Sequence, residues 1–332
     1  MLSFLKFGRS IVDVKKERQN VANLAMGIAS ITLFTIVAQV VLTVILLIVA
    51  PQINYTTTVQ LILNAVTMYG IGMPLSMVFF SRCDIMPAEK KNPKFLTVVA
   101  LIPICFLLTY VGSVLGTMVE SLVASLMGRS AYNPVESAVS SVPLWAVFLF
   151  FVVLAPIFEE IFYRRVVINR LRRYGDLPAI LVSGILFGVI HGNLSQFFYA
   201  AMLGILLGAV YVHTGKLRYT ISLHMMINFM GSFYTMLMQQ KFGGEIPTEF
   251  TDAVAEAFPT GYRMMVAYSN LYTISFLLGI PAMIYFIQQL RLKKGAVTLN
   301  GKNSFRVVLL NWGVWMSALI LLAYFAFGLI YG

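Results

Sequence analysis

Long hydrophobic stretches alternate with short polar stretches along almost the whole chain. A helix needs about 20 predominantly apolar residues to cross the hydrocarbon core of a bilayer, and the hydrophobic stretches recur at that length. The pattern therefore predicts an all-α, polytopic membrane protein with about eight or nine transmembrane helices. The predicted spans are residues 22–50, 58–80, 95–118, 144–163, 178–195, 197–213, 219–240, 264–290 and 307–331.

Composition and charge agree with this pattern and give it an orientation. Hydrophobic residues make up 59% of the 332 residues and charged residues only 11%, which lies outside the range of soluble globular domains. Short cytoplasmic loops carry an excess of Lys and Arg, so we expect a cytoplasmic N-terminus and an external C-terminus. This topology, with attraction to anionic lipid headgroups, accounts for the net charge of +11 without a nucleic-acid partner. The segments expected inside hold 21 of the 24 basic residues: the N-terminus, 81–94, 164–176, 214–218 and 291–306.

The stretch LAPIFEEIFYRRVV, residues 154–167, places charged residues inside an apolar segment. Such residues are expensive in a bilayer unless they are paired or face water, and they mark functional sites. Glu160 and Arg164 stand four residues apart on one helix face, within reach of an ion pair. Glu159 is turned about 100° away and has no partner on its own helix, so its carboxylate is free to act as a general base. The alternative is a buried ion pair that only fixes helix packing.

His191 is the second intramembrane ionisable site, in the stretch SGILFGVIHGN. Gly184 and Gly188 share its helix face, and small residues at this spacing let helices approach closely. The histidine should therefore point into the bundle. At about 1.5 Å per residue, Glu159 lies roughly 21 Å from Arg173 and His191 lies roughly 20 Å from Pro178, so both can share one depth in the membrane.

The segment YTISLHMMINFMGSFYT carries His224 and Asn228 one helical turn apart, at the head of a polar stripe. Two neutral donors aimed at one point in a dry site suit an oxyanion hole, because fixed dipoles stabilise developing negative charge there. A hydrogen-bonded seam between helices is the alternative. His224 is only six residues from Arg218, so counting residues gives it a shallower depth than Glu159.

Three short motifs in chain order resemble those of one membrane family. The segments EEIFYR (159–164), FGVIH (187–191) and HMMIN (224–228) match EExxxR, FxxxH and HxxxN without substitution. These motifs are those of the CPBP family, also called Abi, or CAAX prenyl protease and bacteriocin-processing proteins. On this basis the chain divides into residues 1–142 with the N-terminal segment and three spans, a catalytic core over 143–240 with a CAAX-protease-like arrangement of helices, and residues 241–332 with an external loop and the last spans.

The resemblance implies a glutamate-dependent intramembrane endopeptidase that needs neither a metal nor another cofactor. It implies that Glu159 and His191 activate water, and that His224 and Asn228 bind the oxyanion. It also implies that Glu160 and Arg164 support the site and that Phe187 orients the helix of the histidine. The expected partners are the lipid bilayer and a hydrophobic or membrane-tethered peptide or protein, in the cell membrane of a bacterium. Peptide maturation, bacteriocin immunity and membrane signalling are the roles associated with the family.

Two alternative functions remain open from the sequence. A zinc-dependent intramembrane protease could use His191, His224 and a glutamate as ligands, although the chain lacks the HExxH motif that gives such sites their geometry. The other alternative is a membrane scaffold, immunity protein or proton-coupled transporter without enzymatic activity, in which the same polar residues serve packing or ion relay.

Overall fold

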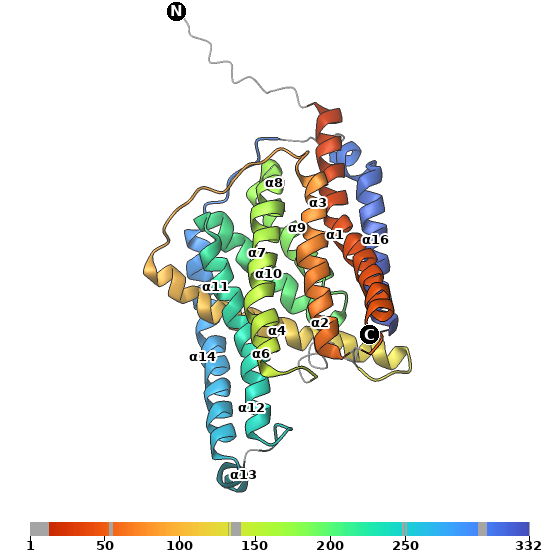
Figure 1. Ribbon diagram of the computed structural model, residues 1–332. Coiled ribbons are helices and arrows are strands. Elements are labelled where there is room, and N and C mark those ends of the chain that lie inside the picture. The colour runs from red at the N-terminus through yellow and green to blue at the C-terminus, as the bar shows by residue number, and fades with distance from the viewer. Residues whose placement is uncertain are drawn as a thin grey trace, which may run out of the picture.

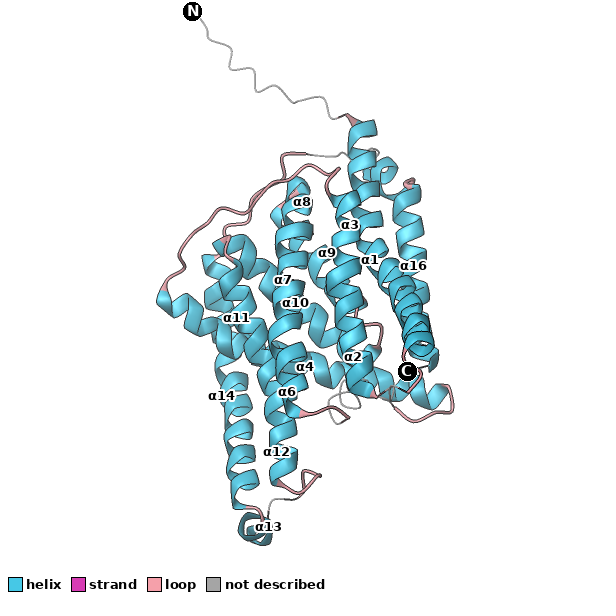
Figure 2. Cartoon of the chain, viewed as in Figure 1, coloured by secondary structure: helices cyan, strands magenta, loops and turns pink. Residues whose placement is uncertain are grey.

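The computed structural model is a bundle of helices, and it describes residues 13–52, 56–131, 133, 141–247, 249, 251–297 and 304–331. Figure 2 shows that the loops gather mainly at the two ends of the bundle. Among these described residues, seven helices are long and apolar enough to cross a membrane, so the predicted all-α polytopic membrane fold is confirmed. They span Val14–Val49, Thr57–Phe80, Phe95–Leu126, Leu144–Tyr174, Leu194–Thr214, Pro259–Gln289 and Trp312–Ile330.

In the first half of the chain, three long helices precede the helix Leu144–Tyr174, which is called the catalytic helix because it carries the candidate catalytic glutamates (Figure 1). The second helix (Thr57–Phe80) and the catalytic helix each contain π-helical segments. Such segments are wider than α-helical turns and often occur at functional sites. The elements are α1 (Val14–Val49), α2 (Thr57–Ala65), η1 (Val66–Gly72), α3 (Met73–Phe80), α4 (Phe95–Leu126), α6 (Leu144–Ala146), η2 (Val147–Leu154), α7 (Ala155–Glu160), η3 (Ile161–Ile168), α8 (Asn169–Leu171) and η4 (Arg172–Tyr174).

The second half of the chain folds back around the catalytic helix, and its last helix packs against α1. Its elements are α9 (Asp176–Val189), α10 (Leu194–Thr214), α11 (Leu217–Asn228), η5 (Phe229–Tyr234), α12 (Thr235–Lys241), α13 (Asp252–Ala257), α14 (Pro259–Gln289), η6 (Phe305–Leu309) and α16 (Trp312–Tyr331).

One predicted span is wrong at its end. The span predicted over 178–195 would carry His191 on a helix, but α9 ends at Val189 and His191 lies in the turn that follows. Gly192 has a φ of 70°, a left-handed conformation that breaks the helix and that glycine adopts readily. Asn193 then caps α10, because its side chain accepts a hydrogen bond from the backbone N–H of Gln196.

Helices α9 and α10 pack closely through glycines, as the sequence predicts. A Cβ atom added to Gly184 would lie 2.6 Å from the backbone nitrogen of Ile205, and one added to Gly188 would lie 2.7 Å from the carbonyl oxygen of Phe197. Gly204 faces Gly184 in the same interface. Helices α9 and α10 thus pack closely against each other on either side of the His191 turn.

The basic end of the bundle, at the top of Figure 1, is tied together by ion pairs. Arg173, at the end of the catalytic helix, binds Glu17 of α1 at 2.5 Å and Asp84 of the loop after α3 at 2.8 Å. A hydrogen bond from Lys16, together with the charge of Arg173, lowers the pKa of the Asp84 carboxyl. These contacts connect α1, the loop after α3 and the catalytic helix.

Candidate active site

The catalytic helix, Leu144–Tyr174, holds a charged pair that is wholly buried. Arg164 donates from Nε to Glu160 Oε2 at 2.8 Å and from Nη2 to Glu160 Oε1 at 3.0 Å, and both side chains are 0% exposed. The spacing of four residues therefore gives the ion pair that the sequence predicts. A bidentate pair of this kind fixes the guanidinium and the carboxylate in one geometry.

The guanidinium of Arg164 is also held from α9. Its Nη1 donates to Ser183 Oγ at 3.3 Å, and the Ser183 hydroxyl in turn donates to the carbonyl of Tyr163 at 3.2 Å. The Phe187 ring lies 5.5 Å from the Arg164 Cζ atom. Three groups therefore fix the position of Arg164, and its charge is satisfied within the protein.

His224 connects the two glutamates. Its Nδ1 lies 3.1 Å from Glu160 Oε1, and its Nε2 lies 3.7 Å from Glu159 Oε2. Because the Glu160 carboxylate accepts a hydrogen bond, Nδ1 carries a proton and Nε2 faces Glu159. The Glu159 side chain keeps 14% of its surface exposed, whereas that of Glu160 has none. The two adjacent carboxylates thus have different environments.

The shallow position that residue counting gives His224 does not hold, because it lies beside both glutamates. The turn before α11 is itself covered by the loop after α3: the backbone N–H of Lys91 donates to the carbonyl of Thr214 at 2.7 Å. A Cβ atom on Gly215 would lie 2.3 Å from the carbonyl oxygen of Glu89. Helix α11 therefore starts beneath a loop, closer to the level of the glutamates than the number of residues suggests.

His191 joins this group through Phe187 and has no direct hydrogen bond to Glu159. Its Nδ1 lies 2.7 Å from the carbonyl oxygen of Phe187 and donates to it, so Nε2 is left as the acceptor. The Phe187 ring, 1% exposed, meets the imidazole of His191 edge-on at 5.1 Å and that of His224 at 5.5 Å. One buried ring therefore spaces the two histidines.

Asn228 lies one helical turn beyond His224 and is anchored to the catalytic helix. Its Nδ2 donates to the carbonyl of Phe151 at 2.8 Å. The Ser232 hydroxyl donates to the backbone carbonyl of Asn228 at 2.5 Å. An amide nitrogen carries two hydrogens, so one N–H of Asn228 remains for another acceptor.

Two residues near the site are missing from the sequence prediction. Ser183 holds Arg164, and its position one helical turn before Phe187 is a signal that could have identified it. Tyr69, in η1, stacks its ring on Phe158 with a centroid distance of 4.7 Å and an interplanar angle of 7°, and its hydroxyl is directed at the Glu159 carboxylate. No motif or periodic pattern in the second span marks Tyr69.

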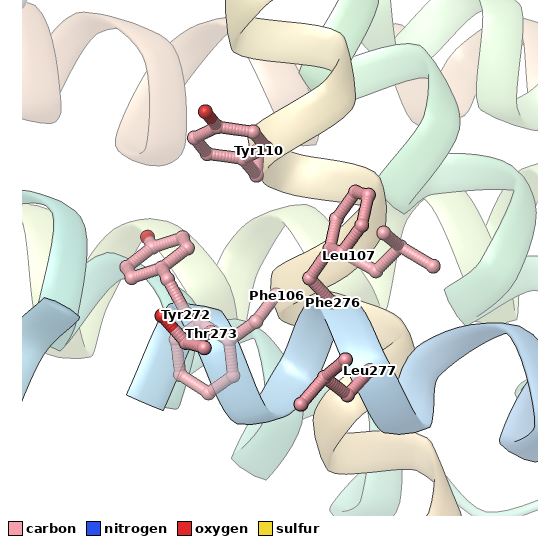
Figure 3. A pocket seen from close by; sticks show the side chains of 7 residues that line it. All are labelled: Phe106, Leu107, Tyr110, Tyr272, Thr273, Phe276 and Leu277. Atoms are coloured by element: carbon pink, nitrogen blue, oxygen red, sulfur yellow. The ribbon is translucent and has the colours of Figure 1, made fainter. Parts of the chain in front are cut away.

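Neither a metal-binding cluster nor the aromatic groove between α4 and α14 coincides with these residues. Across the described part of the chain, no three His, Cys, Asp or Glu side chains are grouped so that they could hold a metal ion. A groove of about 350 Å³ lies between α4 and α14, where aromatic rings form much of its wall (Figure 3). Its lining consists of Phe106, Leu107, Tyr110, Tyr272, Thr273, Phe276 and Leu277.

One comparison with known proteins finds a family match that covers the candidate site. Residues 141–230 match the model of the Rce1-like family, described as type II CAAX prenyl endopeptidase Rce1-like. All seven predicted site residues fall within the matched segment, and the predicted resemblance to the CPBP and CAAX protease family is confirmed. The chain has no significant match among curated proteins or among solved structures. The family match over residues 141–230 and the apolar helices together support an integral membrane protein whose matched segment is similar to intramembrane endopeptidases of the CAAX type.

Proposed function

We propose that the protein hydrolyses a peptide bond in a hydrophobic or membrane-tethered peptide, with Glu159 as the general base. The observation that carries the proposal is the contrast between the two adjacent glutamates. Glu160 is fully buried and bound by Arg164, whereas Glu159 keeps 14% of its side chain exposed and has no bidentate partner. A carboxylate that is both deep in the bundle and accessible can hold water beside a substrate.

Water activation falls to Glu159 and His191 in this proposal. The Nδ1 of His191 is occupied by the carbonyl of Phe187, which leaves Nε2 as an acceptor for a water hydrogen. Glu159 takes the other hydrogen of the water as a proton while the water oxygen attacks the carbonyl carbon of the substrate. The hydrogen that is bound to His191 stays on the attacking oxygen. The tetrahedral intermediate then collapses, the C–N bond breaks, and the protonated carboxyl of Glu159 returns its proton to the leaving amine.

His224 and Asn228 stabilise the oxyanion of that intermediate in this proposal. Asn228 offers its remaining N–H, and His224 offers Nε2–H when the ring is doubly protonated. The Glu160 carboxylate lies 3.1 Å from Nδ1 and the Glu159 carboxylate lies 3.7 Å from Nε2, so carboxylate oxygens face both ring nitrogens. Fixed donors of this kind act strongly in a site from which water is largely excluded.

The substrate class follows from the family and from the membrane setting. The matched family is described as type II CAAX prenyl endopeptidase Rce1-like, so a peptide that carries a lipid near its C-terminus is the first candidate. Peptide maturation, bacteriocin immunity and membrane signalling are roles in which a bacterial enzyme of this kind could cleave a hydrophobic peptide without a prenyl group.

The test is cleavage by the purified protein in lipid vesicles, with prenylated and unprenylated hydrophobic peptides followed by mass spectrometry. Glu159→Gln should reduce kcat on the order of 10² to 10⁴-fold without changing the unfolding temperature. His224→Ala and Asn228→Ala should each reduce it about 10² to 10³-fold, the usual effect of losing one oxyanion donor. Activity should persist in strong chelator.

The zinc alternative predicts different results in the same assay. An asparagine amide is a poor zinc ligand, so a zinc enzyme should tolerate Asn228→Ala and should lose activity in chelator until zinc is added back. That outcome would replace the glutamate mechanism with a metal mechanism. Absence of cleavage for every peptide would favour a scaffold or transporter.

A further inference from the structure

Tyr69 is a polar residue of the second helix whose hydroxyl faces the candidate base from outside the matched family segment. Its ring stacks on Phe158, the neighbour of Glu159 in the chain, at 4.7 Å and nearly parallel. From this position the hydroxyl reaches the Glu159 carboxylate. The contact joins residues 90 positions apart in the chain, on two different helices.

The opposite side of η1 is held firmly against α1. The buried hydroxyl of Thr67 lies 2.9 Å from Gln39 Oε1 of α1 and 2.8 Å from the carbonyl oxygen of Leu63 in its own helix. A Cβ atom on Gly72 would lie 2.3 Å from Thr35 Oγ1 and 3.1 Å from the carbonyl oxygen of Ile31, so the two helices touch there. Thr67 and Tyr69, two residues apart, point to roughly opposite faces of the helix. Anchoring on α1 therefore fixes the direction in which Tyr69 projects.

We infer that Tyr69 is a positioning residue for Glu159, an inference that rests on the proposed function. A phenol O–H that donates to one carboxylate oxygen leaves the other oxygen directed at the water it must activate. The stacked Phe158 ring holds the phenol in place, and the π-helical form of η1 agrees with the tendency of such segments to occur at functional sites. A helix outside the three motifs would then complete the geometry of the catalytic base.

The experiment compares wild type, Tyr69→Phe and Tyr272→Phe in the vesicle assay, with the best-cleaved peptide. Tyr69→Phe keeps the ring and its stacking but removes the donor. Because a hydrogen bond to a charged group contributes about 1.5 to 3 kcal/mol, kcat should fall about 10- to 10²-fold, with KM within twofold and an unchanged unfolding temperature. Tyr272→Phe, which removes a hydroxyl that accepts from Tyr268 at 3.3 Å on α14, should leave kcat unchanged.

The possible outcomes separate this inference from the proposed function. Cleavage that depends on Glu159 but is unaffected by Tyr69→Phe overturns the positioning role alone. A rise in KM at constant kcat also overturns it, because Tyr69 would then contact the substrate rather than the base. If wild type cleaves no peptide, or if Glu159→Gln is fully active, the proposed function fails and the role of Tyr69 fails with it.

Discussion

The helix of the candidate site and the first two helices of the chain differ in their charged residues. No Asp, Glu, Lys or Arg occurs between Gln19 and Ser81, which covers most of α1 and all of the second helix. The lower part of α1 instead exposes apolar side chains such as Val40 and Ile48. In the core, Glu159, Glu160 and Arg164 lie in the middle of one helix, where each is paired or faces another polar group.

This difference shows that the two parts of the fold make different kinds of contact at the candidate site. A charged side chain in a membrane costs several kcal/mol unless its environment compensates it. The core supplies that compensation with ion pairs, Ser183 and the two histidines. The surrounding helices contribute uncharged contacts at the few points where they reach the site. Tyr69 from the second helix and Gly328 from α16 are two such points.

The largest expected effect is the loss of stability when the buried Glu160–Arg164 pair is broken, compared with the loss when the Glu120–Arg129 pair of α4 is broken. Glu160→Gln should leave the fully buried Arg164 without its counter-charge, which commonly costs roughly 3 to 5 kcal/mol. The unfolding temperature in detergent and the yield of folded protein should fall, together with activity. Denaturant titration followed by tryptophan fluorescence would measure the loss.

Glu120→Gln is the matched control in α4. Glu120 binds Arg129 at 2.8 Å, but Arg129 also donates to the carbonyls of Ser130 and Leu329 and keeps 21% of its side chain exposed. Since Arg129 retains acceptors, the expected loss is smaller, roughly 1 to 3 kcal/mol, and kcat should not change. Equal losses for the two variants would contradict the contrast between core and surroundings.

The next effect tests whether α16 shapes the site. A Cβ atom on Gly328 would lie 1.8 Å from the carbonyl oxygen of Gly192, the residue after His191. Gly328→Ala must therefore move the turn that carries His191. A displacement of about 1 Å at a catalytic group can lower the rate 10²-fold, so we expect a fall in kcat of about that size, measured in the peptide assay.

Gly313→Ala provides the comparison within the same helix. Its Cβ atom would lie 2.9 Å from the Cα of Ala22, which disturbs the packing of α16 on α1 far from the His191 turn. We expect Gly313→Ala to lower stability without lowering the kcat of the folded protein. If both glycine variants lose the same activity, α16 supports the bundle in general and does not act on the turn.

Hydropathy predicts most of the fold because the bilayer imposes a fixed length on apolar helices. It cannot predict where α9 ends, since Val189 and Ile190 continue the apolar pattern. The break at His191 depends on the positive φ of Gly192 and on the close approach of Gly328, more than 130 residues later. Tertiary contacts of this kind leave no periodic signal in the local sequence.

The candidate site is predictable to the extent that its contacts are local. The Glu160–Arg164 pair follows from helical spacing, and the chain order of the motifs identifies the histidines. The level of His224 depends on the loop that covers Thr214, and the approach of Tyr69 to Glu159 joins two distant helices. Both require the three-dimensional arrangement of several helices, which spacing along one helix does not contain.

The smallest expected effect on stability concerns exposed ion pairs in the loops, in contrast to the fully buried pair of Glu160. Glu89 is exposed and binds Lys293 and Lys91, the latter at 3.1 Å, so it connects the loop after α3 to the loop after α14. Hydrogen bonds, first from Lys293 and then from Lys91, lower the pKa of Glu89 from 4.5 to about 2. The folded state therefore gains stability from these pairs above the unfolded pKa, and loses it as the pH falls toward 2.

Solvent and salt screen exposed pairs strongly, so Glu89→Gln should lower the unfolding temperature only slightly at pH 7 and low salt. The difference from wild type should shrink at pH 3 and in high salt. A difference that grows on acidification, or that does not respond to salt, would show that Glu89 acts through something other than these two lysines.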